Sequence, residues 1–198
     1  MAADGNTYLH IAAGSGDIDK VNAAIKAGAD VNDGFSPLHV TAYKGHKDVA
    51  EILIGAKANG RSSYKAPVYS FNHCSNRRPS RSGYDLIDAG TNKEARCERQ
   101  CTPLICAAQE GHADVVRILI DVGANKEACD KHLFTPLMLG STPERDRDVV
   151  KIMIGSRANK EARSQNQYTP LIWAATKGHQ EVVRILMMQV QTQRHVAR

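Results

Sequence analysis

Three cysteines that lie close together in the sequence are the first candidates for chemistry: Cys97, Cys101 and Cys106. Cysteine thiolates bind zinc, but a structural zinc site needs four ligands within tetrahedral reach. His112 lies about 10 Å or more from Cys101, at 1.5 Å per residue along a helix, and Cys129 belongs to a later turn. Because the fourth ligand is missing, the sequence predicts no metal site.

The chain also lacks the motifs that position catalytic groups. It has no glycine-rich phosphate loop, no nucleophile elbow and no His-Glu-x-x-His sequence. The sequence therefore predicts no catalytic residue, no cofactor and no enzyme.

The amino terminus lacks the basic stretch and apolar run of a secretory signal, and no segment has the apolar length of a membrane span. The number of cysteines, five, is odd and their spacing is irregular, which does not suggest an oxidised framework. We expect a soluble, intracellular protein in the cytoplasm, with a nuclear location left open, and no contact with a membrane.

One segment accounts for the positive balance of charge, which is +5 for the whole chain. Residues 52–84 contain no Asp or Glu, and their basic residues are Lys57, Arg61, Lys65, Arg77, Arg78 and Arg81. A solvated loop is the simplest interpretation of this segment. The alternatives are a contact for nucleic acid or an acidic partner, and a phosphorylation site at Ser80, which follows two arginines as in the targets of basophilic kinases.

Two short phrases recur in phase along the chain. The phrase Thr-Pro-Leu begins at Thr102, Thr135 and Thr169, with spacings of 33 and 34 residues, and a similar phrase begins at Ser36. The phrase Asn-Lys-Glu-Ala precedes each of the three Thr-Pro-Leu phrases and begins at Asn92, Asn125 and Asn159. A period of this length is typical of a stacked helical repeat.

The best copy shows what each part of the repeat does. Thr102 can cap a helix and Pro103 fits its first position. Gly111 breaks this helix, and Gly123 fits the left-handed end of a second helix. The apolar face of the second helix consists of Val115, Val116, Ile118, Leu119 and Ile120.

This pattern resembles the ankyrin repeat, which implies an all-α solenoid of stacked antiparallel helix pairs with short projecting turns or hairpins. We predict a single array over residues 1–198 with about six repeats. The approximate units are 1–32, 33–59, 60–92, 93–125, 126–159 and 160–198. The third is degenerate and the last resembles a C-terminal cap, because its ending is polar and Val190 replaces the closing glycine.

Several copies depart from the repeat. Lys57 and Arg157 stand where a glycine normally ends the second helix, so these helices either end differently or carry a strain of about 1 kcal/mol. The first two copies are spaced by only 29 and 30 residues, which predicts stunted turns. Pro79 and Gly83 interrupt the second helix of copy three and predict a break in the stack there.

The histidines occupy repeated framework positions, and the resemblance implies that they form hydrogen bonds within and between units. They are His10, His39, His46, His112 and His179. The sequence therefore assigns them a structural role.

The resemblance further implies that the chain binds another protein through its projecting turns and concave face, as a monomeric scaffold or adaptor without cofactor. The candidate contact residues are Tyr43, Arg99, Gln109, Glu110, Lys131, His132, Phe134, Asn166, Tyr168, Trp173, Thr176 and Lys177. We predict Phe134, Tyr168 and Trp173 as the anchors, because interface hot spots favour Trp and Tyr. For Trp173 a structural role as a bulky filler between units is an equal alternative.

Two other functions stay open on the sequence. The segment 57–81 could bind nucleic acid or an acidic partner, a weaker interpretation than protein binding, and its binding would then depend on salt. The array could also be a detached part of a larger protein with no function of its own.

Overall fold

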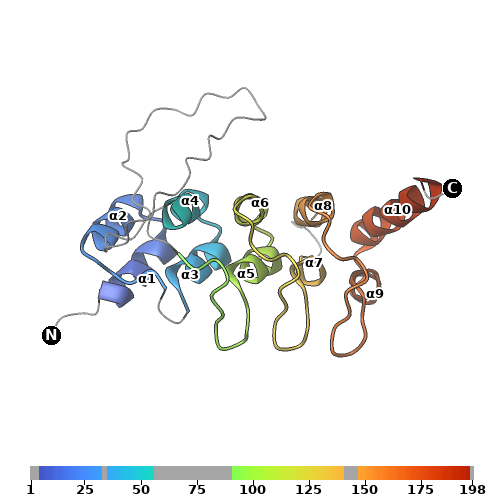
Figure 1. The fold of residues 1–198 in the computed structure, drawn as a ribbon, viewed down its shortest axis with the longest axis horizontal. Coiled ribbons are helices and arrows are strands. Elements are labelled where there is room, and N and C mark those ends of the chain that lie inside the picture. Colours follow the sequence, from blue (N-terminus) through green and yellow to red (C-terminus); the bar gives the residue numbers. More distant parts are fainter. Residues whose placement is uncertain (1–4, 33–34, 56–90, 141–146, 197–198) are drawn as a thin grey trace, which may run out of the picture.

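The computed structural model describes residues 5–32, 35–55, 91–140 and 147–196, and all the regular structure in these ranges is helical (Figure 1). The helices are α1 (Gly5–Ser15), α2 (Ile18–Lys26), α3 (Pro37–Lys44), α4 (Lys47–Gly55), α5 (Pro103–Gln109), α6 (Ala113–Asp121), α7 (Pro136–Leu139), α8 (Arg147–Gly155), α9 (Pro170–Thr176) and α10 (Gln180–Val196).

The helices form two rows that run along the long axis of the molecule. Helices α1, α3, α5, α7 and α9 pack side by side in an inner row, and α2, α4, α6, α8 and α10 form an outer row (Figure 1). The turns that precede α5, α7 and α9 project on the same side of the stack. The predicted all-α solenoid of stacked helix pairs is thus confirmed.

The inner helices begin as the repeated phrase predicts. Proline occupies the first turn of α3, α5, α7 and α9, where it loses no hydrogen bond. The hydroxyls of Thr102 and Thr169 accept hydrogen bonds from Ile105 N and Ile172 N, at 3.4 and 3.3 Å. Thr135 stands at the same position in α7 but makes no side-chain cap bond.

Small and branched aliphatic side chains fill the space between the rows. Ala107 and Ala108 are fully buried on α5, so neighbouring helices can approach closely. Val115, Val116 and Leu119 are fully buried on α6 and face the inner row. Burial of such side chains contributes about 1.5–3 kcal/mol each, which is how thin layers with few aromatic residues remain folded.

The stack continues directly from copy two to copy four. Helix α3 packs against α5, and α4 packs against α6. The ring of His39 bonds Cys101 O at 3.0 Å, and the Thr91 hydroxyl donates to Leu53 O. The break predicted at copy three therefore does not separate these units, because the interface groups of copy four fit those of copy two. Residues 56–90, which include Lys57, Pro79 and Gly83, lie outside the described residues.

Helix α8 ends in the same way as α6 although it has no glycine there. Gly123 N donates to Ile120 O at 2.9 Å with φ of 77°, and Arg157 N donates to Ile154 O at 2.9 Å with φ of 63°. Of the two predicted alternatives for Arg157, the structure adopts the left-handed one. A side chain with a Cβ is disfavoured in this region by about 1–2 kcal/mol.

We expect Arg157→Gly to raise the free energy of unfolding by up to about 1 kcal/mol, because relief of the left-handed strain exceeds the added entropy of the unfolded chain. The reverse change, Gly123→Arg, should lower it by about as much. Urea denaturation followed by circular dichroism measures both. A loss of stability in Arg157→Gly would show that the arginine side chain stabilises this turn by other contacts.

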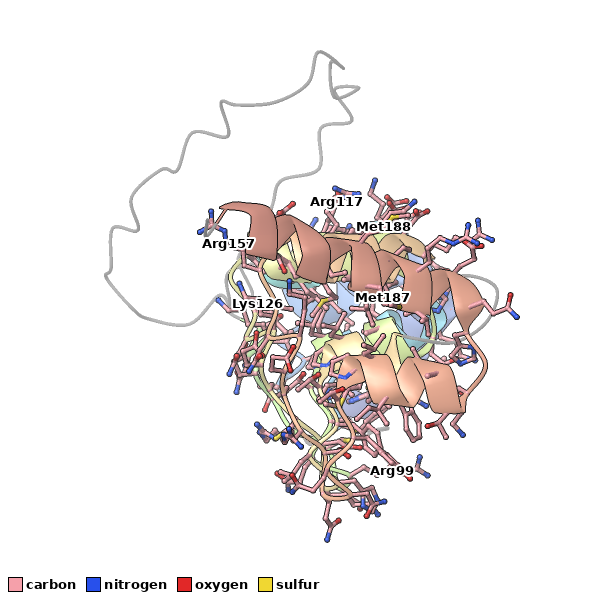
Figure 2. The ribbon with its side chains drawn as sticks, turned by 90° about the vertical axis from the view of Figure 1, so that its right-hand side faces the viewer. Arg99, Arg117, Lys126, Arg157, Met187 and Met188 are labelled. Carbon is pink, nitrogen blue, oxygen red and sulfur yellow. The ribbon has the colours of Figure 1, made fainter. Side chains whose placement is uncertain are left out.

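Large apolar side chains are exposed at the C-terminal end of the described stack. Ile172 and Met187 are 44% and 51% exposed, whereas Ile105 and Met138, which hold the place of Ile172 in earlier units, are fully buried. Figure 2 views the stack from this end and labels Met187 on α10. Helix α10 runs through Val190 to Val196 without a break. The assignment of residues 160–198 as a cap stays a prediction.

Candidate protein-binding surface

Backbone hydrogen bonds align the projecting turns with one another. Lys131 N donates to Arg99 O at 3.3 Å, and Gln165 N donates to His132 O at 2.9 Å. The turns before α5, α7 and α9 therefore form a short ladder, and their side chains are held at fixed spacing along one edge of the molecule (Figure 1).

Each of these turns is also closed internally. A backbone bond of 3.0–3.1 Å joins Cys97 N to Cys101 O, Asp130 N to Phe134 O, and Ser164 N to Tyr168 O. One residue of each turn takes a left-handed conformation: Gln100, Leu133 and Gln167, with φ of 60–61°. The turns are thus ordered by their own backbone, and the residue that precedes each inner helix is fixed in place.

The three predicted anchors form one aromatic cluster. The ring centroids of Phe134 and Trp173 are 4.6 Å apart, and those of Tyr168 and Trp173 are 6.0 Å apart. Tilted pairs at such distances are favourable contacts between aromatic rings. All three side chains are half-buried, so each ring also presents a surface to solvent.

A cation lies beside this cluster. Lys177 Nζ is 4.8 Å from the centroid of the Trp173 ring, within the range of a cation–π contact. Thr176 is exposed on the same helix, but its hydroxyl donates to Ile172 O at 2.8 Å. Lys177 therefore belongs with the aromatic cluster, while the hydroxyl of Thr176 is already engaged within α9.

The other predicted contact residues fall into two places. Lys131, His132 and Asn166 are exposed in the turns before α7 and α9. Tyr43, Arg99 and Gln109 line a groove between α3 and the turn before α5. Glu110 is half-buried at the end of α5. The basic segment and Ser80 lie outside the described residues.

The groove has a volume of about 670 Å³. Its lining is Phe35, Tyr43, Arg96, Cys97, Glu98, Arg99, Gln100, Cys101, Cys106 and Gln109. The sequence predicted Tyr43 and Gln109 as contact residues on the first helices and Arg99 as one on a turn, but it did not indicate Phe35. The short spacing of the first two copies was one signal, but the groove also depends on the contact between copies two and four, which the sequence did not show.

Two of the thiols in the groove, those of Cys101 and Cys106, are kept protonated. Burial raises the pKa of Cys101 to about 11 and that of Cys106 to about 12. Thiolates rather than thiols react as nucleophiles and bind metals. Within the described ranges, no group of three or more His, Cys, Asp or Glu side chains is placed to hold a metal ion.

The predicted hydrogen bonds of the histidines between units are confirmed for four of them. The Nε2 atoms of His10, His39, His46 and His112 bond the carbonyls of Phe35, Cys101, Gly14 and Tyr43, at 2.7–3.0 Å. The corresponding acceptor position for His179 is residue 142, outside the described residues. These rings join neighbouring units.

His39 is the most enclosed of these rings. It is fully buried, its Nδ1 lies 2.9 Å from Ser36 Oγ, and the ring stacks on Phe35 with 5.1 Å between centroids. Burial lowers the pKa of His39, because an imidazolium would lose its hydration there. The ring is therefore neutral at physiological pH.

In the part of the chain that the structure describes, no helix combines the length and the apolar character needed to cross a membrane.

Comparisons with known proteins give partial matches. The chain is 41% identical over 64 residues to Notch-regulated ankyrin repeat-containing protein of Xenopus tropicalis, covering 30% of this chain and 55% of that protein. It is 26% identical over 104 residues to ankyrin repeat, SAM and basic leucine zipper domain-containing protein 1 of Ornithorhynchus anatinus, covering 50% of this chain and 22% of that protein. It is 40% identical over 57 residues to protein phosphatase 1 regulatory subunit 12A of Mus musculus, covering 27% of this chain and 6% of that protein.

The chain thus spans about half the length of the first of these relatives and much less of the other two. The family model for ankyrin repeats in three copies matches residues 1–62 and 80–164, and the model for a single ankyrin repeat matches residues 166–190. These matches cover most of the chain and coincide with the helix pairs described above. The chain belongs to the ankyrin repeat family.

Proposed function

We propose that this protein is a scaffold or adaptor that binds a protein partner through the projecting turns and inner helices of its C-terminal half. Ankyrin repeats generally mediate interactions between proteins, and one relative is a regulatory subunit. The observation that supports this site is the aromatic cluster of Phe134, Tyr168 and Trp173, whose rings contact one another at the base of the turns.

The physics of interfaces favours such a cluster as an anchor. Aromatic side chains bury a large area at a small cost in side-chain entropy, and hot spots are enriched in Trp and Tyr. Here the rings are already held against one another, so little ordering is needed on binding. The exposed residues of the turns, among them Lys131, His132 and Asn166, would surround the anchor as a polar rim.

We also propose that the protein acts by binding and not by catalysis. The side chains that are best suited to chemistry have other tasks: the histidines bond backbone carbonyls of neighbouring units, and Cys101 and Cys106 are protonated in buried places. The alternative function, binding of nucleic acid or an acidic partner through residues 57–81, rests on the sequence alone.

The test starts from a partner identified by affinity capture and mass spectrometry. Trp173→Leu should weaken binding of the purified partner by about thirtyfold, the effect of a hot spot worth about 2 kcal/mol. Leucine keeps an apolar side chain against Phe134, so the fold should persist. Isothermal titration calorimetry measures the affinity.

The matched control is Ile11→Ala, which changes the same repeat position in the first unit, where Ile11 is 65% exposed. This variant should bind with unchanged affinity. If Trp173→Leu binds as tightly as the unaltered protein while both variants keep their thermal unfolding midpoints, the aromatic cluster is a structural contact and the proposed site is wrong.

A further inference from the structure

We propose that the groove between α3 and the turn before α5 is a second docking site, which binds an extended acidic peptide segment of a partner and takes up one aromatic or branched aliphatic side chain. This site does not depend on the aromatic cluster around Trp173. It uses residues of copies two and four, whereas the cluster uses residues of copies five and six.

The groove exists because two turns of unequal length became neighbours. From Gly28 to Ser36 the chain advances by 8 residues, whereas the same stretch from Gly123 to Thr135 takes 12. Since α3 packs directly on α5, the shorter turn lies beside a full-length one. On this side, the turn before α5 therefore has a neighbour that is four residues shorter in sequence.

Among the described residues, the backbone ladder begins at this turn, because the equivalent acceptor in copy two, residue 33, lies outside them. Lys131 N and Gln165 N donate to carbonyls of the preceding turns. Glu98 holds the same repeat position, 33 residues before Lys131, and none of the described residues accepts a hydrogen bond from its N–H. An extended peptide that reaches the N–H of Glu98 can pair with this turn through main-chain hydrogen bonds.

The walls of the groove suit an apolar side chain. Phe35 and Tyr43 are each 47% exposed and form one wall. The thiols of Cys101 and Cys106, kept neutral by burial, belong to the other. The volume of about 670 Å³ lies in the range of about 300–1,000 Å³ that is common for ligand sites.

The charges at the groove favour an acidic occupant. Arg96 and Arg99 line it together with a single carboxylate, Glu98. Arg96 is fixed by its bonds to Gln100 O and Cys129 O, at 3.0 and 2.9 Å. Arg99 is exposed, and no ion pair among the described residues includes it. Figure 2 shows Arg99 at the turn end of the molecule, far from Arg117 on the outer row.

The same charges argue against self-occupation by the segment that joins copies two and four. That segment, residues 56–90, has six basic residues and two acidic ones, Asp85 and Asp88, so its net charge is +4. Its approach to Arg96 and Arg99 would bring like charges together, which costs binding energy. A separate acidic segment is the occupant that fits the electrostatics.

The test is a selection of random nonapeptides, displayed on phage, against the full chain. Selected peptides should be enriched in Asp and Glu together with Phe, Tyr, Trp, Leu or Ile. Synthetic copies should bind the Tyr43→Ala, Arg99→Glu double variant at least about tenfold more weakly by fluorescence anisotropy. Arg117→Glu, the same charge change on the outer row, should leave their affinity unchanged.

A second measurement locates the bound peptide without any substitution. Alkylation by iodoacetamide, followed residue by residue with mass spectrometry, should slow several-fold at Cys97 when a selected peptide is present. Cys129 is also half-buried but does not line the groove, so its rate should not change.

Three results would overturn the proposal: enrichment of basic peptides or of none, equal affinity for the double variant, or equal alkylation of Cys97 with and without peptide. Trp173→Leu should bind the selected peptides normally. The proposal for the groove and the proposal for the aromatic cluster can therefore be contradicted independently of each other.

Discussion

Replacing Gly45 with alanine is expected to lower the free energy of unfolding by about 2–5 kcal/mol, the sum of backbone strain and overpacking. Gly45 ends α3 with φ of 76°. A Cβ there would lie 2.4 Å from Nδ1 and 2.7 Å from Cγ of His112. That ring is held in place by its bond to Tyr43 O at 3.0 Å. The alanine would therefore break a link between units as well as strain a turn.

Gly123→Ala separates the two causes. Gly123 has φ of 77°, and a Cβ there meets nothing within 4 Å, so this variant should lose only the backbone term of about 1–2 kcal/mol. Urea denaturation at pH 7.5 measures both variants. In a His112→Ala background the cost of Gly45→Ala should shrink toward that of Gly123→Ala. Equal losses in the two glycine variants of the unaltered chain would contradict the steric argument.

Replacing His39 with methionine is expected to lower the free energy of unfolding by about 2–4 kcal/mol at pH 7.5. Methionine is the residue at the same position in copy five, Met138, and it is fully buried there, so the volume is tolerated. The variant would nevertheless leave Cys101 O and the Ser36 hydroxyl without the ring that bonds them. Chemical denaturation followed by circular dichroism gives the difference.

The same variant should change the pH dependence of stability. Burial lowers the pKa of His39 in the folded state below its ordinary value of 6.5. The unfolded chain therefore binds a proton first as the pH falls, and the contribution of the neutral ring is present above pH 6.5 and is lost below it. Between pH 7.5 and 5 the unaltered protein should lose more stability than His39→Met. Parallel curves would show that the His39 ring does not titrate differently in the two states.

Local rules predicted the parts of this structure that depend on near neighbours in the sequence. Thr102 and Pro103 start α5 as the phrase predicts, since a cap and the first turn involve adjacent residues. Phe134 and Tyr168 precede the two helix starts at equivalent positions, and Trp173 lies one turn inside α9. Their proximity, which the structure confirms, follows from the repeat itself, while their role in binding is a proposal.

The parts that were not predicted depend on which units touch. The bond from His39 to Cys101 joins residues 62 positions apart, and no local pattern shows that copy four packs on copy two. The groove depends on that contact, so the sequence did not show that Tyr43 and Arg99 line the same groove. Arg157 shows a different limit: the choice between a strained turn and another helix end depends on whether the next unit fits, which spacing alone does not determine.

The direct contact between copies two and four has a consequence for how this array can diversify. Leu53 and Thr91, which flank residues 56–90, are joined by a hydrogen bond, so the described residues on either side of this segment are held together by the fold. Doubling the length of such a segment costs only about 0.6 kcal/mol of closure entropy. Residues 56–90 can thus change in sequence and length under selection of their own. The junction is a natural position for an inserted reporter or epitope.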